Sequence, residues 1–287
     1  MEFVRFILVT GLLSKVLSKG NTPYDYINQT SWAGNCKGNQ QSPINLEVSN
    51  GICEKNIVFN VEVSNTQMNF KAEHMTNTVG ANGKFTHLTA TNIGGKVMSF
   101  DAESFHFHAK SEHTINKKFY DLELHIVHHI KPEYTHLTKR HKAVLGIMFN
   151  SKAGAADNPL LSAVIETINN KTSKAVTPKA LFPFIKPVSP FYMYEGSLTT
   201  PNCDEVVNWY VVEQPVDVNP NQLLFLTSKW KGNTTFANGT VGNNRNIQNL
   251  NSRVIKKGGY VCEEKFVYFF SFLILYIFIN YFIFKLL

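Results

Sequence analysis

The chain has 287 residues, of which 44% are hydrophobic and 17% are charged, and its formal net charge is +7. This length suits one large domain or two small ones, with enough chain to bury a substantial core. The lysines and arginines are dispersed, and no basic run carries interleaved aromatic residues, so the composition argues against a nucleic-acid-binding protein. Attraction of the basic surface to anionic glycans or membranes stays open.

The N-terminal segment, residues 1–20, predicts a signal peptide. Residues 6–13 are apolar, and small residues suited to cleavage follow them. Because Glu2 weakens the positive start and Lys15 interrupts the apolar stretch, an amphipathic N-terminal helix is the alternative.

Residues 21–264 are expected to form the folded domain. Short runs of alternating apolar and polar residues between Asn- and Gly-rich turns indicate a mainly antiparallel β fold. The run 143–149 is apolar throughout, as expected for a central strand buried on both faces. Further strands are expected at 58–63, 121–129 and 206–212, and helices at 155–169 and 219–228.

Six of the ten histidines fall between residues 105 and 129. His106 and His108 are two residues apart among phenylalanines, so in a β-strand both imidazoles project from one face. His125 lies in a second strand-like run and joins them on that face if the two strands pair. Three neutral imidazoles with an open fourth position form the ligand set of a catalytic zinc site.

Glu123 stands two residues before His125, on the same face of the expected strand. A carboxylate there accepts the distal ring N–H of a metal-bound imidazole. The alternative is a set of ordinary strand histidines without a metal. Since the neighbouring residues are bulky and apolar, this face is expected to be buried, and buried imidazoles need partners. The pattern therefore favours a metal site.

The C-terminal segment, residues 266–287, is almost entirely apolar. As a helix it would span about 33 Å, enough to cross a bilayer core of about 30 Å. Two interpretations stay open, a transmembrane helix and a glycolipid (GPI) anchor signal. Sequons at Asn28, Asn170, Asn233 and Asn238 are compatible with a secreted glycoprotein at the cell surface or another extracytoplasmic membrane face.

Several motifs follow one another along the chain. They are Gln-Ser-Pro-Ile-Asn at 41–45, Phe-His-Phe-His at 105–108, Ser-Glu-His-Thr at 111–114, Glu-Leu-His-Ile-Val-His at 123–128, Gly-Ser-Leu-Thr-Thr-Pro at 196–201 and an Asn/Arg-rich run at 244–253. In this order they resemble the α-class carbonic anhydrases, in particular the extracellular, membrane-anchored type. The resemblance implies a single α+β domain around a large, mainly antiparallel, twisted sheet with a few short helices.

The resemblance also implies a zinc lyase, a carbonic anhydrase that hydrates CO2 reversibly to bicarbonate and a proton by means of a zinc-bound hydroxide. It implies Zn2+ on His106, His108 and His125. Thr199 would carry a hydroxyl that is held by Glu112. A hydroxyl that donates to a carboxylate can only accept from the zinc hydroxide, which orients the hydroxide toward CO2.

Further roles follow from the same resemblance. Glu123 is expected to orient His125. His113 and Tyr194 are expected to be structural, within the same polar network as Glu112. Thr200 is expected to contact substrate or bicarbonate. The apolar wall of the substrate pocket is expected from Val127, Val144, Leu198, Val207 and Trp209.

An even number of cysteines in a chain with a predicted signal peptide indicates disulfides. Cys36 and Cys203 match the bridge of extracellular family members, which would tether the loop that carries the threonines. Cys53 and Cys262 remain as a second pair that would close the chain ends.

The sequence departs from the family pattern at three places. Only Ala109 and Lys110 separate Phe-His-Phe-His from Ser-Glu-His-Thr, where the family usually has Trp-Gly and a loop, so the local geometry around Glu112 differs from the pattern. Ser104 stands where a glutamine often supports the first zinc histidine. The turn that matches the proton-shuttle position, residues 77–79, has no histidine, although His74 and His87 are near it in sequence. We therefore expect proton release to limit turnover.

A rival interpretation is a carbonic-anhydrase-like adhesion or glycan-binding module of the cell surface, with little or no turnover. Such relatives usually lack one or more of the zinc histidines. This sequence retains His106, His108 and His125 together with Glu112 and Thr199, which favours the enzyme. The expected partners are CO2 or bicarbonate and, through the C-terminal segment, a membrane; the sequence identifies no protein partner.

Overall fold

The computed structural model describes residues 24–47, 52–53, 57–75, 77–186, 189–228, 234–235 and 241–259. Its strands are β1 (Asn45–Leu46), β2 (Ile52–Cys53), β3 (Phe59–Val63), β4 (Met68–Phe70), β5 (Glu73–His74), β6 (Val79–Asn82), β7 (Thr86–Thr91), β8 (Val97–His108), β9 (Thr114–Ile115), β10 (Leu122–Ile130), β11 (Lys142–Ser151), β12 (Lys174–Val176), β13 (Phe191–Gly196), β14 (Val207–Val212), β15 (Val216–Val218), β16 (Thr234–Thr235), β17 (Val241–Gly242) and β18 (Lys256–Gly258). The helices are α1 (Pro159–Asn170), α2 (Pro178–Leu181) and α3 (Pro220–Ser228), with 3-10 turns η1 (Gln29–Ser31) and η3 (Pro132–Leu137).

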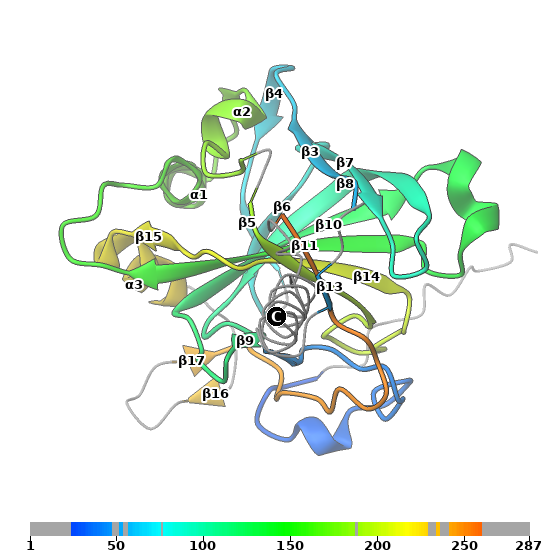
Figure 1. Cartoon of the computed structure of the whole chain (residues 1–287). Helices are drawn as coiled ribbons and strands as arrows, with labels where there is room; N and C mark the ends of the chain where they lie inside the picture. Colours follow the sequence, from blue (N-terminus) through cyan, green and yellow to red (C-terminus); the bar gives the residue numbers. More distant parts are fainter. Residues whose placement is uncertain are drawn as a thin grey trace, which may run out of the picture.

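Among the described residues, one sheet of 12 strands dominates the fold, with β2-β18-β13-β14-β11-β10-β8-β6-β5 as its main path. Its central pairs β8–β10 and β10–β11 are antiparallel, whereas β11–β14 is parallel. The long strands β8, β10 and β11 cross the middle of the molecule, and the three α-helices lie at one side of them (Figure 1). The single α+β domain with a mainly antiparallel sheet is therefore confirmed.

Strand β11 is the buried centre that its apolar run predicts. It lies between β10 and β14, and Ala143 to Phe149 are all buried. A strand buried on both faces has no polar position, which explains why its sequence does not alternate.

Strand β8 separates an apolar face from a polar one. Phe105 and Phe107 are fully buried and pack with Phe70, Phe85 and Phe182 in the larger core. Each such ring contributes about 1.5–3 kcal/mol by its burial. Because side chains alternate along a strand, the intervening histidines must face the other way. The aromatic core therefore fixes the direction in which the histidines point.

The predicted helix at 155–169 begins later than expected. It is α1, which starts at Pro159, with Asn158 as its N-cap. The Asn158 side chain accepts hydrogen bonds from the backbone N–H groups of Leu160 and Leu161 at 3.0 and 3.3 Å. Proline is favoured at the first helical position and asparagine at the cap, and together they define the start. The helix predicted at 219–228 is α3 and begins one residue later than predicted.

Cys36 and Cys203 form the predicted disulfide. Cys53 lies on β2, opposite Lys257 of β18, and Cys262 lies outside the described residues, so the second bridge stays a prediction. The predicted signal peptide, residues 1–20, and the C-terminal segment, residues 266–287, also lie outside them. In the part of the chain that the structure describes, no helix is long and apolar enough to span a membrane.

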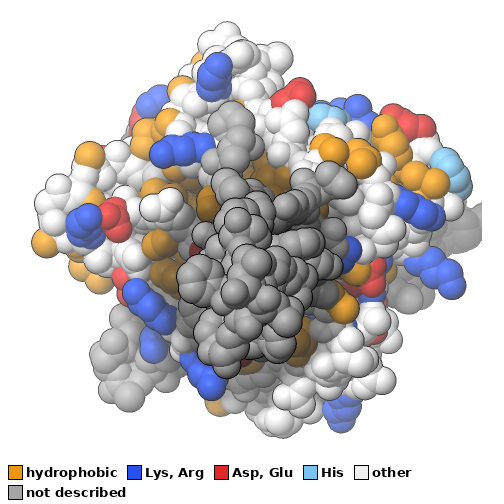
Figure 2. Space-filling model, in the orientation of Figure 1, with side chains coloured by type: hydrophobic (Ala, Val, Ile, Leu, Met, Phe, Trp, Pro, Cys, Tyr) orange, Lys and Arg blue, Asp and Glu red, His pale blue; other side chains and the backbone are white. Residues whose placement is uncertain are grey.

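The basic side chains are dispersed over the face of the molecule that Figure 2 shows, as the sequence predicts. On the face shown in Figure 2, the Lys and Arg side chains are scattered among acidic and neutral ones, and do not gather into one patch. On this face, outside the part that grey atoms cover, the distribution is typical of a solvated surface.

Replacing both Cys36 and Cys203 by serine is expected to lower the free energy of unfolding by about 2–5 kcal/mol. The bridge joins residues 167 positions apart and ties the N-terminal segment to the loop after Thr199, so its loss frees both. Urea denaturation of oxidised wild type and variant measures the change, and reduced wild type is the control that should match the variant. Equal midpoints for all samples would contradict the prediction.

The burial of His128 predicts that the folded protein loses stability as the pH falls. It is fully buried, donates through Nδ1 to the Ile126 carbonyl oxygen at 3.0 Å, and lies 2.8 Å through Nε2 from the Thr86 hydroxyl. Burial lowers the pKa of His128 to about 4, below the value of about 6.5 in an unfolded chain. As the pH falls between these values, the unfolded state binds a proton that the folded state rejects. Stability should then fall by about 1.4 kcal/mol per pH unit.

The measurement compares unfolding free energies of wild type and His128→Gln from pH 7.5 to pH 4.5, roughly spanning that window. The variant should lose less stability over this range. His129→Gln, an exposed neighbour on β10, is the matched control and should follow wild type. Parallel curves for wild type and His128→Gln would refute the assignment.

Candidate metal centre

The three predicted ligand histidines lie together on one face of β8 and β10. His125 is the direct antiparallel partner of His106, and His108 follows two residues along β8. The ring centroids are 5.0 Å apart for His106–His108, 5.3 Å for His106–His125 and 4.6 Å for His108–His125. One nitrogen of each ring lies within 4.8 Å of the other two, a spacing that suits a shared metal ion.

The second nitrogens of two rings have partners elsewhere. His108 donates through Nδ1 to the carbonyl oxygen of Asn243 at 2.8 Å, and His125 Nε2 is 2.9 Å from Glu123 Oε1. These bonds leave Nε2 of His108 and Nδ1 of His125 for the centre of the cluster. His108 Nε2 is buried and has no hydrogen-bond partner among the described residues. An unpaired buried nitrogen is rare in native proteins and calls for a ligand.

Electrostatics keep the three rings neutral. Desolvation lowers the pKa of His106 to about 3, and it lowers the pKa of His108 well below the usual histidine range. Burial also lowers the pKa of His125, against the raising effect of Glu123. A metal needs unprotonated imidazoles, so these rings are in the binding form at neutral pH.

The fully buried Glu123 carboxylate is the hub of the surrounding hydrogen bonds. Its Oε2 accepts from the backbone N–H groups of Glu112 and His113 at 2.7 and 2.8 Å, and its Oε1 lies 2.7 Å from His113 Nδ1 and 2.9 Å from His125 Nε2. Burial alone would raise the pKa of Glu123, but His113 and His125 hold it well below its usual value. Gly146 leaves room for the Glu123 carboxylate, because a Cβ at position 146 would lie 3.1 Å from Glu123 Oε1.

His113 and Tyr194 belong to this Glu123 network. His113 Nε2 is 2.6 Å from the Tyr194 hydroxyl, which donates to Ser42 Oγ at 2.8 Å. Glu112 joins the same network through its backbone N–H, which donates to Glu123 Oε2. Glu123, on the neighbouring strand, is the acceptor that Glu112 and His113 share.

The Glu112 carboxylate is fully buried and faces the histidines. Its Oε1 accepts from the backbone N–H of Arg245 at 2.8 Å and lies 3.4 Å from His108 Nδ1. Burial raises the pKa of Glu112 well above its usual value, and Thr199 is the neighbour that lowers it most. Glu112 Oε2 nevertheless has no partner of regular geometry among the described residues. Thr199 is therefore adjacent, but the predicted hydrogen bond is not fully formed.

The predicted apolar wall assembles beside the histidines. Val127 pairs with Val144 across β10 and β11, and Val144 pairs with Trp209 across β11 and β14. The Trp209 ring centroid is 4.8 Å from that of His125. Val144, Val207 and Trp209 are buried in one cluster, and the partly buried Val127 and Leu198 pack against it. Thr200 is half-buried and lies within hydrogen-bond reach of Tyr24.

No histidine occupies the matched shuttle position. Val79 is fully buried in the core, His74 is exposed on β5, and His87 bonds Asp101 at 2.7 Å. In the described part of the chain, the His106 side chain makes no hydrogen bond, which agrees with Ser104 being too short to support it.

Sequence reasoning missed Asn243. Its carbonyl oxygen holds His108 across 135 sequence positions, and its side chain bonds the backbone of Ala109, Asn77 and Phe107. The adjacent Asn/Arg-rich motif at 244–253 is the signal that could have pointed to it.

Comparisons with known proteins agree with this geometry. A family model described as eukaryotic-type carbonic anhydrase matches residues 27–258. Carbonic anhydrase 4 of Mus musculus is 31% identical over 208 residues, covering 67% of this chain and 67% of the relative. The crystal structure of a halotolerant carbonic anhydrase from Dunaliella salina is 26% identical with a TM-score of 0.65, covering 84% of this chain and 100% of that one.

A second solved structure is that of dioscorin complexed with ascorbate. It is 26% identical with a TM-score of 0.63, and the match covers 80% of this chain and 90% of that one. The fold thus occurs under names other than carbonic anhydrase, and the assignment depends on the family model and on the relatives named for the enzyme. Because that model spans most of the chain and includes the whole histidine cluster, the chain belongs to the eukaryotic-type, or α-class, carbonic anhydrases.

Proposed function

We propose that this chain hydrates CO2 reversibly to bicarbonate and a proton, with Zn2+ held by His106, His108 and His125. The observation that supports this proposal most directly is the buried His108 Nε2. It has no partner within the described residues and belongs to a cluster of three neutral imidazoles. Three nitrogen ligands with a fourth position open to water are the pattern of a catalytic zinc site.

A second group, His113, Glu123 and His125, also has ligand atoms within 4.8 Å of one another. Its atoms are already paired: Glu123 Oε1 contacts both rings, and His113 Nε2 contacts Tyr194. A metal there would break these bonds, whereas a metal among the three proposed ligands breaks none. The donor set therefore favours the first group.

When bound, zinc lowers the pKa of its water to about 7, a value established for carbonic anhydrases as a family, and so supplies hydroxide at neutral pH. The protein's contribution is orientation. Glu123 holds the His125 ring so that Nδ1 faces the metal position, and the Asn243 carbonyl does the same for His108 Nε2. Two of the three ligands are thus aligned before a metal arrives.

Thr199 and the apolar wall position the reactants. A Thr199 hydroxyl that donates to Glu112 keeps only its lone pairs for the attacking oxygen, which restricts the direction of attack. Val127, Val144 and Trp209 offer CO2 a surface without competing hydrogen bonds. Thr200, at the half-buried end of the loop, is proposed to contact the bicarbonate product.

The binding-module alternative draws support from the likeness to dioscorin. It leaves unexplained why the neutral imidazoles, the buried Glu112 and Thr199 all converge at one place. Zinc loading and turnover distinguish the two proposals.

We also propose a secretory route for the chain, ending at a membrane-attached extracytoplasmic domain. The Cys36–Cys203 disulfide supports an oxidising compartment. The sequons Asn28 and Asn170 are exposed and accessible to glycosylation. Residues 1–20 are proposed as the signal peptide and 266–287 as the membrane helix or anchor signal.

The direct test is CO2 hydration by stopped flow, normalised to bound zinc. Wild type should bind one zinc per chain, roughly, and turn over, whereas His108→Ala should lose both because one of three ligands is gone. His129→Ala removes an exposed histidine of β10 and is the matched control that should keep both. A wild type that holds zinc without turnover would overturn the enzymatic proposal and favour the binding module.

Glu112→Gln is expected to separate metal binding from catalysis. The amide keeps the shape but presents an N–H where the Thr199 hydroxyl must donate, so the hydroxyl loses its fixed orientation. We expect kcat to fall by about 100-fold, the scale typical of losing one orienting hydrogen bond, while zinc content stays at the wild-type level. Loss of zinc in Glu112→Gln would instead assign Glu112 to metal binding.

Turnover is expected to depend on added buffer. Since Val79 is buried at the matched shuttle position, no histidine there passes the proton to solvent. Initial rates at saturating CO2 should therefore rise with the concentration of an imidazole-type buffer at constant ionic strength. A rate independent of buffer concentration would refute this.

A further inference from the structure

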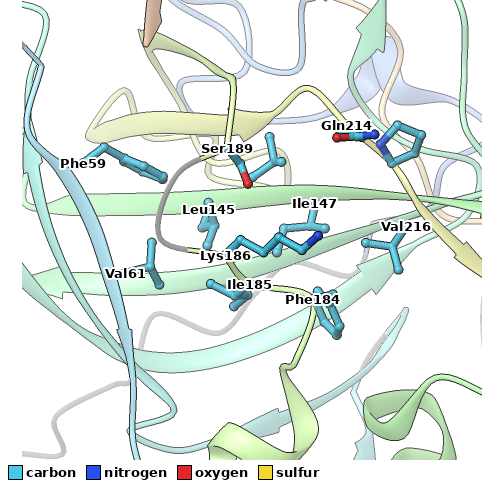
Figure 3. A pocket seen from close by; sticks show the side chains of 12 residues that line it. Phe59, Val61, Leu145, Ile147, Phe184, Ile185, Lys186, Ser189, Gln214 and Val216 are labelled. Atoms are coloured by element: carbon cyan, nitrogen blue, oxygen red, sulfur yellow. The ribbon is translucent and has the colours of Figure 1, made fainter. Parts of the chain in front are cut away.

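A cavity of about 240 Å³ lies on the face of the sheet opposite the histidines. Leu145 and Ile147 of β11 line it and flank Gly146, the residue paired with His125. Since side chains alternate along a strand, these two point away from the metal face. Phe59 and Val61 of β3 form another wall, and Phe184 closes one end (Figure 3). The cavity is therefore independent of the candidate metal centre.

The lining combines an apolar interior with one cation. Among the described residues that line the cavity, Lys186 is the only charged one, and Ser189 and Gln214 add uncharged polar groups. Figure 3 shows the Lys186 side chain lying among Leu145, Ile147 and Ile185. Within the described residues its ammonium forms no ion pair or hydrogen bond. A long aliphatic stem on apolar residues with a free charged end is a typical arrangement of lysine at an apolar surface.

This combination selects a class of ligand. A cation or a polar sugar finds no carboxylate and few hydrogen-bond partners in the cavity, whereas an apolar chain gains about 0.8 kcal/mol for each buried methylene. A negative head group at the mouth would pair with Lys186, which has no partner among the described residues. The volume is below the usual range of about 300–1,000 Å³ for drug-sized ligands, which suits one slender chain.

We propose that this cavity binds a fatty acid, with the alkyl chain against Leu145, Ile147 and Val61 and the carboxylate at Lys186. Its place in the fold agrees with a membrane as the source. The last described residue, Gly259, packs against Ser189 at the cavity, and the predicted membrane segment begins only a few residues later in the sequence. This source rests on the membrane attachment proposed above: a free fatty acid that partitions into such a membrane would be concentrated near the end of the folded domain at Gly259.

The test is photo-crosslinking of the full chain in phosphatidylcholine vesicles with a medium-chain fatty acid that carries a diazirine. Peptide mass spectrometry should map the label to the cavity, on segments containing Phe184 or Val216. Lys186→Glu should reduce this labelling about tenfold, because it replaces an attractive charge pair by a repulsive one. Lys179→Glu, an exposed lysine of α2 that does not line the cavity, is the matched control and should label like wild type.

Val216→Phe provides a second variant, since the larger ring fills the cavity and should also suppress the label. Thermal unfolding midpoints establish that each variant is folded. The readout is the position of the label, so the result does not depend on CO2 hydration. The proposal is overturned if Lys186→Glu labels as strongly as wild type, or if the label maps elsewhere. It is also overturned if a diazirine phospholipid labels the cavity and the free fatty acid does not.

Discussion

The buried carboxylate of Glu123 is the interaction on which the rest of the centre depends. It satisfies two backbone N–H groups and faces two imidazole nitrogens, and its side chain is fully buried. An ionised carboxylate there is tolerable only because every oxygen has such partners. Removing it would leave His125 unoriented and the backbone N–H of Glu112 unpaired, so one group orients a proposed ligand and also positions the proposed catalytic carboxylate.

The sheet makes that arrangement possible through its two different faces. Phe105 and Phe107 pack into the aromatic core, and the same alternation presents His106 and His108 on the opposite face. A slip of one residue in the β8–β10 register would exchange the two faces, so the core and the centre specify the same register. Packing energy from the core thereby holds the histidines in a conformation that would be costly without a ligand.

Local sequence patterns predicted much of the sheet and of the histidine cluster. The His-x-His spacing, the second histidine strand and the apolar run of β11 each depend on strand periodicity, which is visible in the sequence. The Asn243 carbonyl and the Arg245 backbone were missed because backbone groups have no residue signature and act across long sequence separations. The start of α1 was placed too early because the alanines at 155–156 favour a helix in the sequence, whereas Asn158 caps it and Pro159 is its first residue.

X-ray absorption at the zinc edge of the zinc-loaded full chain tests the central claim most directly. The account predicts a four-coordinate metal with three imidazole nitrogens and one oxygen at about 2.0–2.1 Å. A first shell with two imidazoles and a protein carboxylate would assign the metal to His113, Glu123 and His125 and contradict the account. A shell with sulfur would contradict it as well, since no cysteine of the described structure lies in the histidine cluster.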